Sequence, residues 1–237
     1  PTMGGLIFLI PVTVISLFFT DDFPGIVPML LVTLGSAAVG FVDDFIKIVR
    51  KHKDGLNPRQ KSFGIAVVSF AFAYYVAFHP DLGTDMIIPF MGIDSLVVLP
   101  VWFFIPAITI VMYLIINSAN MTDGVDGLAA GVTLIVALFF SVVGMANAEW
   151  NYIVIFCSII AGGCLGFLAF NVHPARVFMG DTGSLALGGA VGAAAVIMKM
   201  PWMLLVAGGI YAAESLSVFL QVTYYKRTKK RIFKMAP

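Results

Sequence analysis

Three short blocks of acidic and amide residues interrupt a largely apolar sequence, and the first is the adjacent pair Asp43 and Asp44. Lys47 follows four residues after Asp43 and three after Asp44, a spacing typical of ion pairs along a helix. Two carboxylates facing one lysine still leave a negative charge without a partner, and adjacent carboxylates raise each other's pKa unless a cation lies close by. The pair is therefore a candidate for binding a metal ion or a proton, and local pairing with Lys47 is the alternative.

The second block, residues 117–127, is dense in oxygen-bearing side chains. It carries Asp123 and Asp126 with two asparagines and a threonine, and we interpret it as a short loop between two apolar segments. The block lacks the glutamate that an EF-hand calcium loop carries at its twelfth position. A turn with a helix cap explains one aspartate, but not both of them together with both asparagines.

The third block, residues 170–184, contains the sequence Gly-Asp-Thr-Gly-Ser, which leads into a new apolar segment. The first N–H groups of a helix lack partners within the helix and therefore attract anions such as phosphate. Asp181 could hold a divalent cation against such a phosphate, since magnesium is commonly bound by one or two carboxylates and the phosphates of a substrate. The alternative is that Thr182 or Ser184 only caps the helix. His173 is a lone histidine without an assigned role.

The composition indicates that membrane helices carry these blocks. Hydrophobic residues make up 60% of the 237 residues and charged residues only 11%. In soluble domains, roughly a quarter of the residues are charged. A helix needs about 20 residues to cross the hydrocarbon layer, and it satisfies its own backbone hydrogen bonds there. Eight apolar segments are candidates: 3–19, 26–49, 63–78, 96–116, 128–146, 152–170, 184–198 and 202–224.

The basic residues give these segments an orientation. Every lysine and arginine except Lys199 lies at 47–61, at Arg176 or at 226–234, which eight alternating crossings place on one side. Loops rich in lysine and arginine stay in the cytoplasm, so this side is predicted to be cytoplasmic. All three acidic blocks fall on the same side. We therefore predict a polar cleft that faces the cytoplasm and handles phosphate with a metal ion.

Other classes of protein explain these features less well. No Walker loop or dinucleotide-binding sequence is present. A secondary transporter also carries acidic residues in the membrane, but its sites lie near the middle of the bilayer, whereas these blocks gather at one face. A purely structural membrane protein would leave all three blocks unexplained. The sequence predicts one all-α, polytopic transmembrane catalytic domain over residues 1–237.

The blocks resemble, in the same order, those of the polyprenyl-phosphate N-acetylhexosamine-1-phosphate transferases, and within them the phospho-N-acetylmuramoyl-pentapeptide transferases. The matching blocks are PTMGG at 1–5, the pair Asp43 and Asp44, NMTDGVDG at 120–127, VFMGDTGSLALG at 177–188, AESLS at 213–217 with Gln221, and RIFKMAP at 231–237. The first and last blocks favour this branch over a sister family that transfers N-acetylglucosamine-1-phosphate from UDP-N-acetylglucosamine to a polyprenyl phosphate. That family is the alternative.

The resemblance implies a magnesium-dependent transferase of the EC 2.7.8 class. Such an enzyme moves phospho-N-acetylmuramoyl-pentapeptide from its UDP conjugate to undecaprenyl phosphate, which gives lipid I and UMP for peptidoglycan synthesis, cell shape and cell division. It lies in the bacterial inner membrane, typically as a homodimer, with the active site facing the cytoplasm. No nucleic-acid partner is implied. Both direct attack and an aspartyl-phosphate intermediate are compatible with the sequence.

The same resemblance implies roles for residues of each block. Asp181 binds Mg²⁺ at the diphosphate with Asn171 nearby, which lowers the charge repulsion met by an incoming phosphate. Asp43 deprotonates or positions the lipid phosphate, and Asp44 supports it. The other substrate-binding candidates are Asn120, Asp123, Gly124 and Asp126 for the nucleotide, Phe178 for the uracil ring, Lys47 and Gln221 for the phosphate and sugar ends, and Thr2.

The resemblance also implies a protein that extends further in both directions. Members of the family have ten spans with both termini outside, so one further span is expected before Pro1 and one after Pro237, and a histidine-rich motif is expected just beyond the latter. Glu214, inside the last apolar segment, either lines a lipid groove, marks a break in the helix or has a buried structural role.

Overall fold

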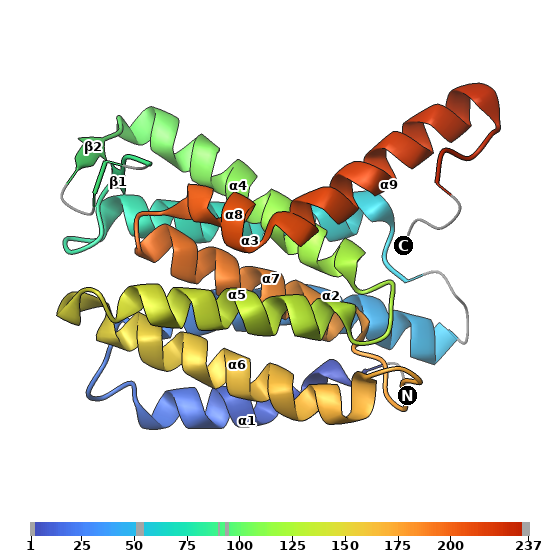
Figure 1. Ribbon diagram of the computed structural model, residues 1–237, viewed down its shortest axis with the longest axis horizontal. Helices are drawn as coiled ribbons and strands as arrows, with labels where there is room; N and C mark the ends of the chain where they lie inside the picture. The colour runs from blue at the N-terminus through green and yellow to red at the C-terminus, as the bar shows by residue number, and fades with distance from the viewer. Residues whose placement is uncertain (1–2, 51–54, 90, 93–94, 234–237) are drawn as a thin grey trace.

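The computed structural model describes residues 3–50, 55–89, 91–92 and 95–233, so Thr2 of the predicted site lies outside the described residues. The described residues form a bundle of helices with one small sheet (Figure 1). In chain order the elements, with η for short 3-10 helices, are α1 Gly5–Phe18, α2 Ile26–Arg50, α3 Pro58–Phe78, β1 Asp85–Ile87, β2 Leu96–Val98, α4 Val101–Thr122, α5 Leu128–Gly144, η1 Ala148–Trp150, α6 Asn151–Asn171, α7 Gly180–Ile197, η2 Pro201–Met203, α8 Leu204–Ala207 and α9 Gly209–Thr228.

Each of the eight predicted apolar segments contains a helix, which confirms the all-α polytopic class. Among the described residues, α2, α3, α4, α6 with η1, and α7 are long and apolar enough to cross a membrane. A sixth crossing exists if η2, α8 and α9 count as one bent span. The helices α1 and α5 are apolar but have only 14 and 17 residues, fewer than the about 20 that a straight crossing needs. Length therefore supports five or six of the eight predicted spans.

The predicted span at 96–116 is wrong at its beginning. Leu96–Val98 form β2, which pairs antiparallel with β1 so that Asp85 lies opposite Val98. Helix α4 begins only at Val101, because Pro100 lacks an N–H group and disfavours a helical conformation in the residue before it. The preceding apolar residues, rich in valine, are stable as a strand instead.

The last predicted span is also corrected, because it is broken into two helices. The segment η2–α8 and α9 meet at a bend of 81°. Gly208 and Gly209 follow each other at the bend, and glycine weakens a helix because it loses more backbone freedom than other residues. The break therefore lies at this glycine pair and not at Glu214, which is inside α9.

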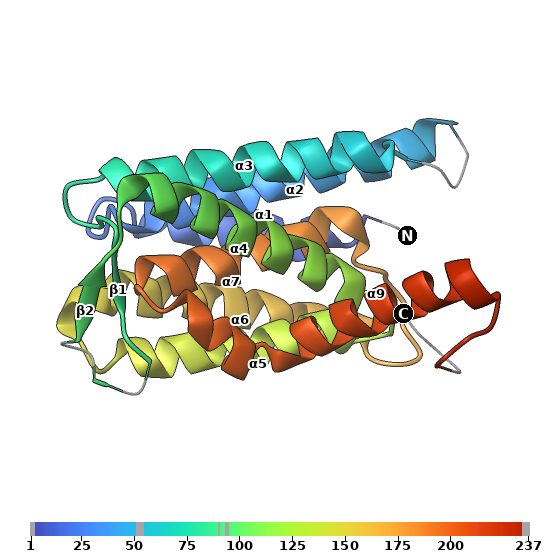
Figure 2. The same ribbon diagram turned by 90° about the horizontal axis from the view of Figure 1, so that it is seen from above.

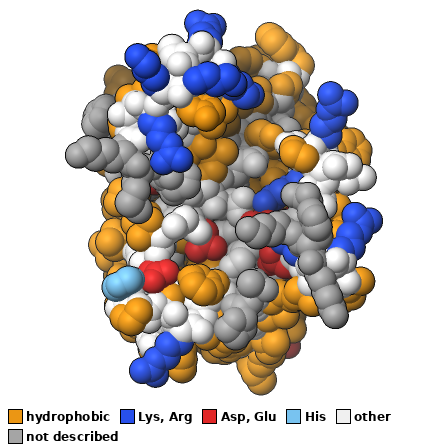
Figure 3. Space-filling model, turned by 90° about the vertical axis from the view of Figure 1, so that its right-hand side faces the viewer, with side chains coloured by type: hydrophobic (Ala, Val, Ile, Leu, Met, Phe, Trp, Pro, Cys, Tyr) orange, Lys and Arg blue, Asp and Glu red, His pale blue; other side chains and the backbone are white. Residues whose placement is uncertain are grey.

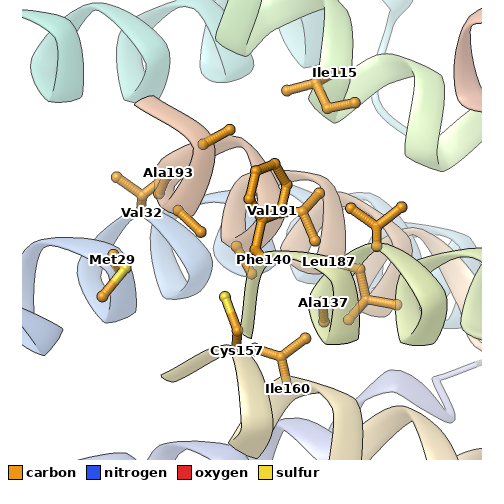
Figure 4. Close-up of a cluster of buried hydrophobic side chains, with 14 of the residues drawn as sticks. Met29, Val32, Ile115, Ala137, Phe140, Cys157, Ile160, Leu187, Val191 and Ala193 are labelled. Atoms are coloured by element: carbon orange, nitrogen blue, oxygen red, sulfur yellow. The ribbon is translucent and has the colours of Figure 1, made fainter. Parts of the chain in front are cut away.

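Helix α7 lies at the centre of the bundle (Figures 1 and 2), and its residues 182–197 are all buried. Small residues let its neighbours approach closely, since a Cβ on Gly188 would lie 2.7 Å from the Cα of Ile116 in α4. Figure 4 shows Leu187 of α7 among buried side chains that include Phe140 of α5 and Cys157 of α6. Tight packing of this kind is a main source of helix association in membranes. Helix α7 is therefore held in place by several other helices.

The two ends of the bundle differ in charge, as the sequence predicts. At the end that carries the α4–α5 and α6–α7 connections, lysines and arginines surround a group of acidic side chains (Figure 3). At the opposite end Lys199, the exception in the charge pattern, forms an ion pair with Asp85 of β1. The indole N–H of Trp202 also donates to the backbone oxygen of Ile87 in β1, at 3.0 Å. The exceptional lysine is thus neutralised by the small sheet.

Candidate active site

Three carboxylates from two helices meet at the charged end of the bundle. Asp43 and Asp44 lie on α2, Asp181 lies in the first turn of α7, and one oxygen of each is within 4.8 Å of those of the other two. Asp43 and Asp44 are only 3% and 4% exposed. The helices come this close because α2 carries glycine at their crossing, where a Cβ on Gly40 would overlap the backbone oxygen of Asp181. The fold therefore unites the first and third predicted blocks.

Two lysines compensate much of this negative charge. The Lys47 ammonium lies 2.5 Å from Asp43 Oδ2, 3.6 Å from Asp44 Oδ1 and 2.7 Å from Asp181 Oδ2. The local helix pairing considered above is thus present, and Lys47 also bridges from α2 to α7. The Lys61 ammonium lies 3.0 Å from Asp181 Oδ2. Three carboxylates and two ammonium groups leave one negative charge over for a cation.

Lys61 is a site residue that the sequence reasoning missed, because this lysine was counted only among the basic residues that orient the spans. The structure places it in α3, which begins at Pro58 behind a capping box formed by Asn57 and Gln60. An asparagine three residues before a glutamine is a recognised signal for the start of a helix. That signal could have moved Lys61 from a loop to a helix, but nothing local indicates its contact with Asp181.

Asp44 caps the N-terminus of α7 from a different helix. Its Oδ2 accepts hydrogen bonds from the backbone N–H of Thr182 at 2.9 Å and from the Thr182 hydroxyl at 2.7 Å. A negative charge at this position is favourable because the first N–H groups of a helix carry a partial positive charge. The residue before α7, Met179, makes no side-chain cap. Asp44 therefore fixes the position of α7, with both the N–H and the hydroxyl of Thr182 as hydrogen-bond donors to its carboxylate.

Asn120 contacts Asp181 directly. Its amide nitrogen donates to Asp181 Oδ1 at 2.7 Å and to the Ser184 hydroxyl at 2.8 Å, while its amide oxygen accepts from Lys61 at 3.0 Å. The interpretation of 117–127 as a loop is wrong in its first half, because α4 continues to Thr122. The buried face of the helix extends to Thr122, and the Asn120 side chain reaches two residues of α7 from this last turn. Its predicted contact with a nucleotide stays a prediction.

A polar pocket of about 290 Å³ opens beside the carboxylates, in the acidic centre of the face in Figure 3. Its lining comes from α2, the α4–α5 connection, the end of α6, the α6–α7 connection and the beginning of α7. The lining residues are Asp44, Lys47, Asp123, Gly124, Val125, Asp126, Asn171, Phe178, Gly180 and Asp181. Eight of these ten, all but Val125 and Gly180, were predicted as site residues. Phe178 is 53% exposed, which leaves its ring free to meet a ligand.

Two side chains hold the walls of this pocket together. The Asn171 amide oxygen accepts from the backbone N–H of Gly127 at 3.0 Å, and its nitrogen donates to the backbone oxygen of Val177 at 2.8 Å. Asp126 Oδ2 lies 3.0 Å from His173 Nδ1 and accepts from the backbone N–H of Ala175 at 3.1 Å. These two contacts lower the pKa of Asp126 below its ordinary value. The predicted roles of Asn171 in metal binding and of Asp126 in nucleotide binding stay predictions.

Gln221 is not among the residues that line the pocket. Its side-chain oxygen accepts from the backbone N–H groups of Ile232 and Phe233, at 3.1 and 3.0 Å, in the turn after α9. Glu214 is half-buried on α9, where its backbone oxygen accepts from the Ser217 hydroxyl at 2.8 Å. The structure thus gives Gln221 a local contact, and its predicted contact with the substrate stays a prediction.

Asp123, just after α4, has an unusual acidity. Burial and the nearby charges of Asp181 and Asp44 raise its pKa from the ordinary 3.8 to about 7, against the opposing effect of an N–H from Gly180. The ionisation of Asp123 therefore costs folding free energy, because the raised pKa contributes stability that is complete below pH about 4 and is lost as pH rises through 7.

We expect Asp123→Asn, measured without divalent cations, to raise the melting temperature above that of the wild type, and more so at pH 8 than at pH 5. The asparagine lacks the charge whose burial destabilises the wild type at the higher pH. Thermal unfolding of both proteins in detergent at the two pH values tests this. An equal difference at both pH values would contradict the raised pKa.

Comparisons with known proteins agree with this geometry. Residues 26–199 match the family described as glycosyl transferase family 4, and this range contains all three acidic blocks. Over 237 residues the chain is 57% identical to the phospho-N-acetylmuramoyl-pentapeptide-transferase of Acetivibrio thermocellus, and the match covers 100% of this chain and 71% of that protein. The proteins of the same name from Caldicellulosiruptor bescii and Clostridium novyi are 45% and 44% identical, with all of this chain and 72% of each relative covered.

Proposed function

Because the chain belongs to glycosyl transferase family 4 and, within it, to the phospho-N-acetylmuramoyl-pentapeptide-transferases, we propose that it transfers phospho-N-acetylmuramoyl-pentapeptide from its UDP conjugate to undecaprenyl phosphate. The products are lipid I and UMP. The observation that carries the proposal is the cluster of Asp43, Asp44 and Asp181 beside a polar pocket at one end of a membrane bundle. A water-soluble donor and a membrane-bound acceptor can both reach this level.

The carboxylate cluster fits Mg²⁺ as cofactor. Magnesium prefers hard oxygen ligands and usually binds one or two carboxylates together with the phosphates of a substrate. Asp181 would hold it, with one oxygen each of Asp43 and Asp44 within 4.8 Å of an Asp181 oxygen and Asn171 at the edge of the same pocket. Bound there, the ion would stabilise the negative charge that develops on the diphosphate during transfer.

The residues around Asp181 orient its carboxylate and neutralise the charge of the substrate phosphates. Asp43 accepts the proton of the lipid phosphate or positions it, while Lys47 neutralises both phosphates as they approach. Asp44 acts on the reaction through α7, because it holds the N–H and hydroxyl of Thr182 and so places Asp181. Lys61 and Asn120 fix the orientation of the Asp181 carboxylate.

The nucleotide occupies the pocket beside the cluster in this proposal. Asp123, Gly124 and Asp126 line it and offer oxygen atoms and backbone to the ribose and base. The exposed ring of Phe178 is suited to stacking on uracil, because any nucleobase has a flat π-face. In this proposal the same end faces the cytoplasm from a bacterial inner membrane, and its abundance of lysine and arginine supports that orientation. The chain is further proposed to act as a homodimer, like other members of the family.

The test uses the full-length protein with Mg²⁺, undecaprenyl phosphate and one UDP-sugar at a time, and it measures the release of UMP. Release from the UDP-N-acetylmuramoyl-pentapeptide donor alone, which a chelator abolishes, is the expected result. Release from UDP-N-acetylglucosamine instead would assign the chain to the sister activity. Folded protein that releases no UMP from either donor would overturn the proposal.

A further inference from the structure

The highest concentration of charge outside the site lies at the free end of α9. Five cations fall within six residues there, and all are exposed: Lys226, Arg227, Lys229, Lys230 and Arg231. Within the part of the chain that the structure describes, none of the five is paired with a carboxylate, and Lys229 only lies over the Tyr225 ring at 5.7 Å. Uncompensated cations at this density attract an anionic partner.

The chain folds back on itself at this point and presents the cations on a closed turn. Lys229 ends α9 in a left-handed conformation with φ 57°. Beyond it, the backbone N–H groups of Ile232 and Phe233 donate to the side-chain oxygen of Gln221, two turns back along α9. We name residues 226–233, held in this way, the basic hook. Figures 1 and 2 show that the outer half of α9 projects away from the rest of the bundle.

The surroundings of the basic hook are those of a membrane surface. Before it, α9 exposes large apolar side chains such as Phe219, which is 66% exposed and faces lipid in a membrane. Tyr224 and Tyr225 follow, and tyrosine side chains concentrate where hydrocarbon meets headgroups. Phe233 adds an exposed ring on the segment of the hook that folds back toward α9. The five cations therefore lie at the depth of the lipid phosphates.

From this geometry we propose that the basic hook binds anionic phospholipid headgroups of the leaflet that borders the active site, an inference that takes its orientation from the proposed function. Lipid binding here sets the position of α9. The Ser215 hydroxyl of α9 donates to the Ser118 hydroxyl of α4 at 2.7 Å. Asn120, which contacts Asp181, follows Ser118 by two residues in the same helix. An anchored α9 therefore steadies the helix that orients Asp181.

The first test measures binding without using activity. Thr228→Cys carries a nitroxide label, and the native Cys157 and Cys164 are buried and so unlabelled. Full-length protein is placed in bilayers of phosphatidylcholine alone or with phosphatidylglycerol, and membrane depth is read from relaxation by oxygen and by a water-soluble nickel complex. The label is expected to lie closer to the bilayer with phosphatidylglycerol. Glutamine at all five cationic positions is expected to remove this shift, whereas arginine at the three lysines preserves it.

The second test measures UMP release in the same bilayers. The wild type is expected to be about three- to tenfold faster with the anionic lipid, and the glutamine variant is expected to lose this difference. Gln221→Met, which removes only the acceptor that closes the hook, is expected to lose part of this rate difference.

A glutamine variant with the wild-type depth shift overturns the proposal. Unchanged lipid dependence with a raised KM for undecaprenyl phosphate also overturns it, and would assign the cations to the acceptor. Absence of transfer in the wild type would contradict the proposed function alone, because the depth measurement decides the hook by itself.

Discussion

Asp181→Asn is expected to lower the rate of UMP release on the order of 10³-fold, which is typical for the loss of a charge that stabilises a transition state. The asparagine keeps the shape of the side chain, so the expected effect is on chemistry rather than folding. It loses the negative charge that holds Lys47 and Lys61 at 2.7 and 3.0 Å, and it loses the carboxylate proposed to bind magnesium. Rates under saturating donor and acceptor, in full-length protein, measure the effect.

Asp81→Asn is the matched control, because Asp81 is a described aspartate whose side chain is 89% exposed at the far end of the bundle. It is expected to keep the wild-type rate. If Asp181→Asn, with an unchanged melting temperature, retained a rate within a few fold of the wild type, Asp181 would not be the central carboxylate of the site.

Gly40→Ala is expected to destabilise the protein by more than about 3 kcal/mol, beyond the usual cost of overpacking a core. The added methyl group would overlap the backbone oxygen of Asp181 and lie 2.6 Å from the nitrogen of Thr182. Backbone atoms cannot move aside as a flexible side chain does, so α2 and α7 must separate. We expect a lower melting temperature in detergent and loss of transfer, because Asp43 and Asp44 then no longer reach Asp181.

Gly166→Ala is the control for this substitution. Gly166 lies inside α6, and a Cβ there would meet no atom within 4 Å. Since alanine is the better helix former by about 1 kcal/mol, this variant is expected to be at least as stable as the wild type. Equal destabilisation by both substitutions would show that the close crossing of α2 and α7 is not the cause.

Sequence reasoning succeeded where the signal is local. Apolar segments and basic loops are properties of short stretches. The helices, the basic end of the bundle and the position of all three acidic blocks at that end were therefore predictable. The pair Asp43 and Asp44 and the residue Asp181 were identified because carboxylates are costly beside apolar spans unless they have a function. The identity of the pocket-lining residues followed from the resemblance, which covers both connections around the pocket.

The remaining features depend on contacts that no local pattern encodes. Lys61 meets Asp181 only because the fold brings the beginning of α3 close to the N-terminal end of α7, more than a hundred residues away in sequence. Asn120 was assigned to a loop because a run of polar residues after an apolar segment suggests that the helix has ended. In the structure α4 continues to Thr122, and the Asn120 amide donates a hydrogen bond to Asp181 of α7. The broken helix around Gly208 has hydropathy like that of a continuous span, so composition did not distinguish the two.

The burial of α7 has a consequence for how the protein is assembled in the membrane. Its mean hydropathy of 1.2 is the lowest of the five long spans, whose other values run from 1.5 to 2.5, and 89% of its residues are buried inside the bundle. A helix of glycine and alanine gains little from lipid and much from close neighbours. It therefore gains its stability in the bilayer only when α2 and α4 close around it. Asp181 reaches Asp43 and Asp44 at that step. The cluster of three carboxylates therefore arises only when the bundle is completed, and in a partly inserted chain these carboxylates lie apart.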